Sequence, residues 1–411
     1  MTDLGDLVIS PGIVDTHVHV NEPGRTDWEG FDTATRAAAA GGVTTIVDMP
    51  LNCIPATTTV EALEEKRAAA RSKCHVDVAF WGGVVPGNAS ELDGLVDAGV
   101  RGFKCFLAPS GVEEFQHVDE DDLRVAMRIL TRRDKPLLAH AEDPTVLSDV
   151  ARALQARVGG PDRAAPQYAT YLAMRPPEAE VRAIRILARL ARELGTRVHV
   201  VHVASAEAAA EISRAKDDGV RLTAETCPHY LTFAADEVRD GATEFKCAPP
   251  IREARHRDAL WSALEAATLD LVATDHSPSP PAMKRPGDFI QAWGGIASLE
   301  LSLSAVWSGV AQRFSAAEAG LRACVTFLSE QPAALARLER KGRIAEGCDA
   351  DFVVWDPDAE WTVDPSKLQQ RHKLTPYAGR TLRGRVHGTY VRGVRVWDGE
   401  RIDRAGTGEL L

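Results

Sequence analysis

Short runs of β-branched and apolar residues alternate along the chain with longer Ala- and charge-rich stretches of helical length. The short runs predict eight strands, at Ile13–Val20, Val43–Asp48, Val76–Gly82, Gly102–Phe106, Leu137–Ala141, Arg197–Val203, Arg221–Glu225 and Asp270–Thr274. Eight strands that alternate with helices predict a (β/α)8 barrel of the TIM type, an α/β fold. A doubly wound open sheet is the alternative, but no Gly-x-Gly-x-x-Gly motif follows the first strand.

The pattern changes after about Lys341, where residues 342–355 and Val386–Trp397 predict short antiparallel strands with Gly turns. The chain is therefore expected to contain three parts. These are a residual β-sandwich strand at 1–12, the barrel at 13–340, and a β-sandwich segment with a tail at 341–411.

Composition narrows the classes of function. Of the 411 residues, 45% are hydrophobic and 26% charged, which is typical of a globular protein with ample core. The net charge of −11 argues against nucleic acid or an anionic membrane as the main partner. The sequence has no apolar run of membrane-spanning length and no signal pattern at its start, so we expect a cytoplasmic protein. Seven cysteines without a Cys-x-x-Cys pair favour reduced thiols.

Candidate chemistry lies at the carboxyl ends of the predicted strands, where barrel enzymes place their active sites. Those ends carry His17, His19, Lys104, His140, His202 and Asp275. Two histidines that are two residues apart in a strand project to the same side, as a pair of metal ligands would. Chance spacing could explain His17 and His19 alone, but ligand-type residues at several equivalent strand ends indicate a metal site.

Two positions need separate arguments. His199 and His202 are three apart, so a regular strand puts them on opposite faces. We expect His202 to face the barrel interior and His199 to be structural. Lys104 as an ammonium cannot ligate a metal. Burial among cations favours the neutral amine, which could take up CO2 to form a carbamate with two ligand oxygens. A salt-bridged lysine is the simpler alternative.

Six segments in order resemble the cyclic amidohydrolases, a group that includes dihydroorotases, hydantoinases (dihydropyrimidinases) and allantoinases. They are His17-Val-His19, Gly102-Phe-Lys104-Cys-Phe106, His140-Ala-Glu142, His202-Val-Ala-Ser205, Cys227-Pro-His-Tyr230 and Thr274-Asp275-His-Ser-Pro278. The resemblance extends from about Val8 to Gly393. It implies a (β/α)8 barrel with a flanking β-sandwich. Because relatives begin with more sandwich strands, it also implies that this sandwich is N-terminally truncated and has unpaired edges.

The resemblance also implies a binuclear centre. His17, His19 and Asp275 would hold one metal ion, His140 and His202 the other, and carbamylated Lys104 (N6-carboxylysine) would bridge them. Zinc is the first expectation for these two divalent ions, with iron, manganese or cobalt as alternatives, and CO2 is needed for the lysine. A homo-oligomer, a tetramer in this family, is also implied.

Such a pair of cations would generate a nucleophile from water near neutral pH and polarise the amide carbonyl. Asp275 would be the catalytic residue that moves the proton to the leaving nitrogen as the ring opens. A helix cap is the alternative role for Asp275, because Asp-x-Ser before a loop is a common cap pattern.

Substrate choice depends on four expected contacts, Asn21, Asn52, Ala248 and Gly294. Asn21 and Leu51 stand where dihydroorotases carry an arginine and an asparagine that hold the substrate carboxylate. Losing the arginine disfavours a carboxylated substrate. The segments around Asn21, Asn52 and Gly294 are similar to allantoinases, whereas Ala248 replaces the serine or asparagine usual in relatives.

The resemblance therefore implies hydrolysis of a neutral cyclic ureide, allantoin to allantoate, in purine catabolism. A hydantoinase (dihydropyrimidinase) or a dihydroorotase is the alternative. A non-catalytic dihydropyrimidinase-like scaffold is disfavoured by the six intact ligands. A mononuclear deaminase is disfavoured by Lys104.

Overall fold

Parallel strands form the wall of a barrel in the computed structural model, which describes residues 4–158, 167–403 and 406–411. Its strands are β2 (Ile13–Val18), β3 (Val43–Asp48), β4 (Asp77–Phe80), β5 (Gly82–Gly83), β6 (Phe103–Phe106), β7 (Leu137–His140), β8 (Val198–Val200), β9 (Leu222–Thr226) and β10 (Leu271–Val272). They form two sheets, ordered β2-β3-β4 and β5-β6-β7-β8-β9-β10. A bridge from His276, just after β10, to Val18 of β2 joins the far edges of the two sheets. The predicted barrel is thus confirmed, and its third predicted strand is split between β4 and β5.

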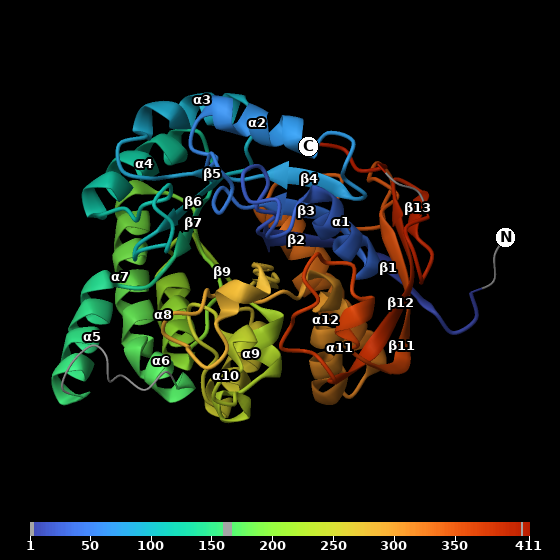
Figure 1. Cartoon of the computed structure of the whole chain (residues 1–411). Helices are drawn as coiled ribbons and strands as arrows, with labels where there is room; N and C mark the ends of the chain where they lie inside the picture. The colour runs from blue at the N-terminus through green and yellow to red at the C-terminus, as the bar shows by residue number, and fades with distance from the viewer. Residues whose placement is uncertain (1–3, 159–166, 404–405) are drawn as a thin grey trace.

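Helices surround these strands (Figure 1). They are α1 (Phe31–Ala40), α2 (Val60–Ala70), α3 (Leu92–Asp97), α4 (Glu120–Arg132), α5 (Pro144–Val158), α6 (Tyr168–Met174), α7 (Pro177–Leu194), α8 (Ala206–Asp217), α9 (Pro228–Thr232), α10 (Ala254–Glu265), α11 (Ser302–Arg313), α12 (Ala317–Val325) and α13 (Gln331–Leu335). Helix α7 shows why they pack inward, because Val181, Ile184 and Leu187 recur at helical spacing and are all buried. None of the described helices has both the length and the apolar character needed to cross a membrane.

A four-stranded antiparallel sheet lies beside the barrel, on the right in Figure 1. Its order is β1 (Val8–Pro11), β11 (Phe352–Thr362), β12 (Thr381–Val391) and β13 (Val394–Trp397). Trp355 of β11 packs edge-on against Trp307 of α11, with ring centroids 5.2 Å apart, and so ties the sheet to the barrel helices. Residues 342–351, expected to begin a strand, form turns instead, and Lys341 before them is fixed by a buried ion pair with Asp351.

Candidate metal centre and substrate cavity

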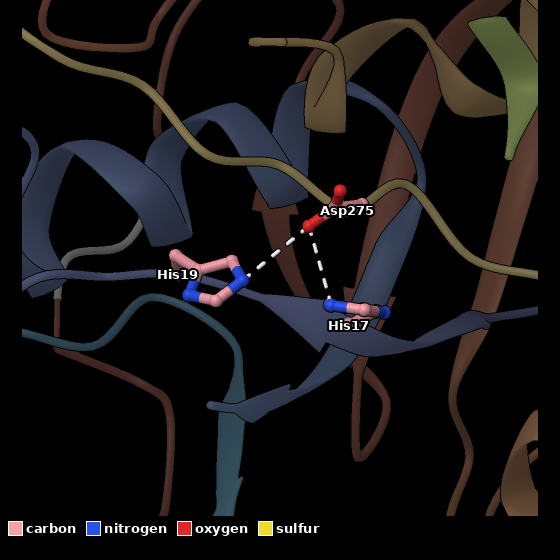
Figure 2. A group of neighbouring side chains, drawn as sticks. All are labelled: His17, His19 and Asp275. Carbon is pink, nitrogen blue, oxygen red and sulfur yellow. Dashed lines mark ion pairs between the residues drawn. The ribbon is translucent and has the colours of Figure 1, made fainter. Parts of the chain in front are cut away.

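The first cluster of candidate ligands brings together residues that follow the first and the last strands of the barrel. His17 and His19 lie at the end of β2, and Asp275 follows β10 with a left-handed backbone (φ 46°). Figure 2 shows both rings directed at the same carboxylate. The Nε2 atoms of His17 and His19 lie 3.2 and 3.3 Å from Oδ1 of Asp275. One ligand atom from each residue falls within 4.8 Å of the others, so the three could hold one metal ion.

The second cluster pairs His140, at the end of β7, with His202, just beyond β8. Nδ1 of His140 and Nε2 of His202 are 3.0 Å apart. Burial lowers the pKa of each imidazole below its usual value, so both are neutral and have lone pairs to offer a cation. The His202 ring also lies 5.5 Å from the His17 ring, centroid to centroid, which brings the two clusters side by side.

Lys104 on β6 has a side chain that is fully buried. Burial lowers the pKa of its amine to about 8, although Glu225 and Asp275 act in the opposite direction. In the described part of the chain, no atom accepts a hydrogen bond from Lys104 Nζ. A buried ammonium without an acceptor is costly, so the surroundings raise the fraction of the neutral amine that carbamate formation requires.

The donor set fits a binuclear centre. Nδ1 of His202 and Nζ of Lys104 are both buried without a partner among the described residues, which is unusual for polar atoms. Burial acts to raise the pKa of Asp275, but attraction to His17 and the hydrogen bond from His19 outweigh it and hold that pKa well below its usual range. Neutral imidazoles, an ionised carboxylate and an unpaired amine are together a suitable environment for divalent cations.

Two carboxylates that the sequence argument missed hold the outer edges of these histidines. Glu225 on β9 accepts a hydrogen bond from Nδ1 of His17 at 2.5 Å, and Glu142 accepts one from Nε2 of His140 at 2.8 Å. Glu142 stands in the His140-Ala-Glu142 segment, so its spacing could have identified it. The contact of Glu225 spans 208 residues, and local sequence gave no signal for it.

His202 lies beside His140 and His17, as expected, but for a reason other than strand alternation. Strand β8 ends at Val200, and His202 has a left-handed backbone (φ 41°), so the alternation of a regular strand does not reach it. His199 is hydrogen-bonded, as expected of a structural histidine, but its partner is Glu225, which contacts His17. The sequence argument therefore missed that His199 connects to the candidate metal ligands.

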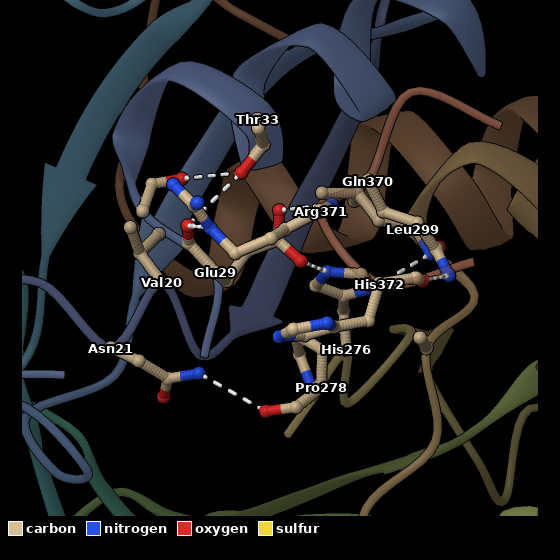
Figure 3. A network of polar contacts seen from close by, with 12 residues as sticks. Val20, Asn21, Glu29, Thr33, His276, Pro278, Leu299, Gln370, Arg371 and His372 are labelled. Atoms are coloured by element: carbon tan, nitrogen blue, oxygen red, sulfur yellow. Dashed lines mark hydrogen bonds and ion pairs between the residues drawn. The ribbon is translucent and has the colours of Figure 1, made fainter. Parts of the chain in front are cut away.

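A cavity of about 880 Å³ opens beside the two clusters. Asn52, Ala248 and Gly294, three of the four expected substrate contacts, line it together with Leu51 and Trp293. The fourth, Asn21, lies outside that lining in the described structure. It is buried, has a left-handed backbone (φ 67°), and donates to the carbonyl of Pro278 at 3.3 Å (Figure 3). Asn21 thus braces the loop after Asp275.

The cations in the cavity wall are already engaged. Among the described lining residues, Lys246 and Arg175 are the two with lysine or arginine side chains. Lys246 donates to the carbonyls of Ile290 and Ala292 at 3.0 and 2.5 Å, and Arg175 pairs with Glu142. Both cations thus already bond protein groups, Lys246 two neutral carbonyls and Arg175 a carboxylate, which weakens the hold that either could have on a substrate carboxylate.

A segment between β11 and β12 reaches back to the barrel (Figure 3). The backbone N–H of Arg371 donates to Oε1 of the buried Glu29 at 3.0 Å, and the guanidinium donates to the Glu29 carbonyl. Oε2 of Glu29 lies 3.6 Å from Nε2 of His276, and His276 is the residue that follows Asp275. The backbone carbonyl of His276 in turn accepts from the N–H of His19 at 2.8 Å. Through Glu29 and His276, the segment between β11 and β12 thereby supports both His19 and Asp275 of the first ligand cluster.

Known proteins resemble this chain in both sequence and fold. The model of the amidohydrolase family matches residues 8–396. An allantoinase of Streptomyces avermitilis is 51% identical over 99% of this chain and 88% of the relative. An allantoinase of Saccharomyces cerevisiae is 42% identical over 97% of this chain and 84% of the relative. The solved L-hydantoinase (dihydropyrimidinase) of Arthrobacter aurescens has a TM-score of 0.91 at 32% identity, covering 98% of this chain and 88% of that one.

Proposed function

The chain belongs to the amidohydrolase family, and from that premise we propose that it hydrolyses the hydantoin ring of allantoin to give allantoate. The cavity wall carries the argument, since its Lys246 and Arg175 are committed to other groups. Dihydroorotate would have to lose the hydration of its carboxylate without an uncommitted cation in return, which costs several kcal/mol. Allantoin is uncharged and meets no such cost. The similarity to allantoinases from bacteria and yeast points to the same ring.

Two metal ions form the reactive centre in this proposal. His17, His19 and Asp275 would hold one ion, His140 and His202 the other, and Lys104 would join them as the carbamate formed when its neutral amine adds CO2 and loses a proton. We propose zinc, with iron, manganese or cobalt as alternatives. When bound, such ions lower the pKa of water and polarise an amide carbonyl.

The residues of the chain then have distinct tasks. Asp275 is ionised at neutral pH because its pKa is held low. Its carboxylate lies at the first ligand cluster and would accept the proton that the attacking water loses. It returns that proton to the ring nitrogen as the C–N bond breaks, and the new carboxyl group then loses its own proton to solvent and is left as a carboxylate. Asn52, Ala248 and Gly294 line the cavity and orient the ring, and the buried positions of the ligands exclude bulk water.

The test is a substrate panel. Metal-loaded protein would be assayed with allantoin, hydantoin, dihydrouracil and dihydroorotate, with the metal content measured on the same samples. We expect kcat/KM for allantoin to exceed that for each other ring by at least about tenfold, which is ~1.4 kcal/mol of discrimination. Hydantoin and dihydrouracil are the neutral alternatives, favoured by the likeness to the solved hydantoinase. A preference for dihydroorotate would contradict the argument from the cavity wall.

We further propose that the chain acts in the cytoplasm as a homo-oligomer, a tetramer by family resemblance. We also propose that the chain is divided into three parts, at residues 1–12, 13–340 and 341–411. Light scattering coupled to size exclusion would measure the mass of the assembly against the 44.4 kDa of one chain. A monomer at micromolar concentration would contradict the tetramer.

A further inference from the structure

A line of hydrogen bonds leads away from His17 through the interior of the barrel. Nδ1 of His17 meets Oε1 of Glu225 at 2.5 Å, and Oε2 of Glu225 meets Nε2 of His199 at 2.9 Å. Nδ1 of His199 then meets the hydroxyl of Thr223 at 2.8 Å. The four residues come from β2, β9 and β8, and His17, Glu225 and His199 are at most 1% exposed. Figure 2 shows the other edge of His17, whose Nε2 faces Asp275.

With both imidazoles neutral, one arrangement of protons satisfies every member of this line. An ionised carboxylate only accepts, so each oxygen of Glu225 requires an N–H from the imidazole that faces it. His17 must then have its proton on Nδ1, which leaves the lone pair of Nε2 for a metal ion. His199 must have its proton on Nε2, so its Nδ1 accepts from the hydroxyl of Thr223. The line therefore selects the tautomer that a metal-binding His17 needs.

We propose that His199 and Thr223 are positioning residues for the metal-dependent reaction, and that they act on His17 through Glu225. This inference rests on the metal centre of the proposed function. It does not depend on which ring is opened. Without His199, Glu225 would keep one donor where a buried carboxylate needs two, and its carboxylate would be free to rotate. That rotation frees the His17 ring from its metal-binding orientation.

Thr223 allows the proposal to be tested by a substitution far from the substrate cavity. It lies near the start of β9, is exposed, and lines a second cavity of about 300 Å³ with Leu222 and Leu271. The candidate ligands lie at the opposite, carboxyl ends of the strands. A substitution at Thr223 therefore leaves the substrate cavity untouched, and an effect on the metal ions would have to pass through His199 and Glu225.

The experiment measures metal affinity without substrate, by competition between the holoenzyme and a chelator. We expect His199→Leu to weaken zinc binding by about 10–100-fold, the usual effect of losing an outer partner of a metal ligand. His199→Gln keeps an N–H for Glu225 and should recover part of that loss. His256→Leu is the matched control, since His256 is buried on α10 and accepts from the backbone N–H of Ala206, away from this line. It should bind zinc as the unmodified protein does.

Thr223→Val should weaken zinc binding by about two- to tenfold, the size of one neutral hydrogen bond, and it keeps the proposal testable if His199→Leu does not fold. In both variants kcat should fall while KM for the ring stays near its original value, because the substrate cavity is unchanged. Zinc affinity in Thr223→Val equal to that of the unmodified protein would overturn the proposal. So would equal losses in His199→Leu and His256→Leu. A failed allantoin assay would leave these affinity measurements standing, so the two proposals fail separately.

Discussion

Replacing Lys104 by methionine should stabilise the metal-free protein and abolish its activity. Methionine has a similar length without the charge, and the lysine it replaces is fully buried with no acceptor for Nζ among the described residues. The substitution removes an unfavourable charge from the barrel interior. It also removes the group proposed to bridge the metal ions, so hydrolysis should be lost.

The pKa of Lys104 sets the size of the stabilisation that Lys104→Met should give. Lowering it from 10.5 to about 8 corresponds to ~3 kcal/mol of destabilisation by the ammonium at neutral pH. With an unfolding entropy of about 2.1 cal/mol/K per residue over 411 residues, Lys104→Met should raise Tm by ~3–4 °C at pH 7. The dependence of stability on pH has the opposite sign to that of a lysine paired with a carboxylate. Between pH 8 and 10.5 the folded protein releases the proton before the unfolded chain does, so its stability rises and the advantage of the variant shrinks.

The assay is thermal unfolding of chelator-treated protein in CO2-free buffer, at pH 7 and again near pH 10. Lys66→Met is the matched control, since Lys66 is equally buried but donates to Asp48 at 2.5 Å and to the Met49 carbonyl at 2.8 Å. Breaking that buried pair should cost about 3–5 kcal/mol. A Lys104→Met protein that melts lower than the unmodified chain, or that still hydrolyses allantoin, would refute the reasoning.

Three further predictions concern other groups. Asp275→Asn should keep the circular dichroism spectrum and lose roughly a hundredfold or more in kcat, the scale of general acid–base catalysis, and near-normal turnover would assign Asp275 a structural role. Burial raises the pKa of Glu300 to about 8, so the stability contributed by its protonated form is lost as the pH rises from about 4.5 to 8. Glu300→Gln should therefore melt at a higher temperature than the unmodified protein at pH 8. An equal difference between the two proteins at pH 5 would contradict this. Asn21→Arg puts an unpaired guanidinium at a buried, left-handed position, so Tm should fall and dihydroorotate should still not be hydrolysed; gain of that activity would place residue 21 in the cavity after all.

The barrel could be predicted from the sequence because the period of its apolar residues is a local property. Strands β3, which is rich in β-branched residues, and β7, which begins with two leucines, are each buried along their whole length, as a strand covered on both faces must be. The six candidate ligands followed from the same reasoning, since parallel strands bring their carboxyl ends to one face. The backbone conformation of single residues could not be predicted in this way. His202 and Asn21 both have positive φ, and no alternation rule covers such residues.

Contacts between distant strands were also beyond sequence reasoning. Glu225 lies 208 residues from His17, and only the closed barrel brings its carboxylate to the imidazole. The same closure gives His199 a role that its position three residues before His202 concealed. Chemistry-bearing residue types were visible in the sequence, whereas the groups that orient them became visible with the tertiary structure.

The buried lysines show how the fold separates structural groups from functional ones. Lys66 and Lys341 are at most 5% exposed, and each ammonium contacts a carboxylate, Asp48 for the first and Asp77 and Asp351 for the second. Lys104 is equally buried, yet its Nζ has no acceptor in the described structure. Residue type and burial are the same in all three, so they cannot explain the difference. The other buried lysines of the described chain, Lys246 and Lys284, donate to backbone carbonyls, so Lys104 alone among these described buried lysines lacks an acceptor, which supports the carbamate proposed for it.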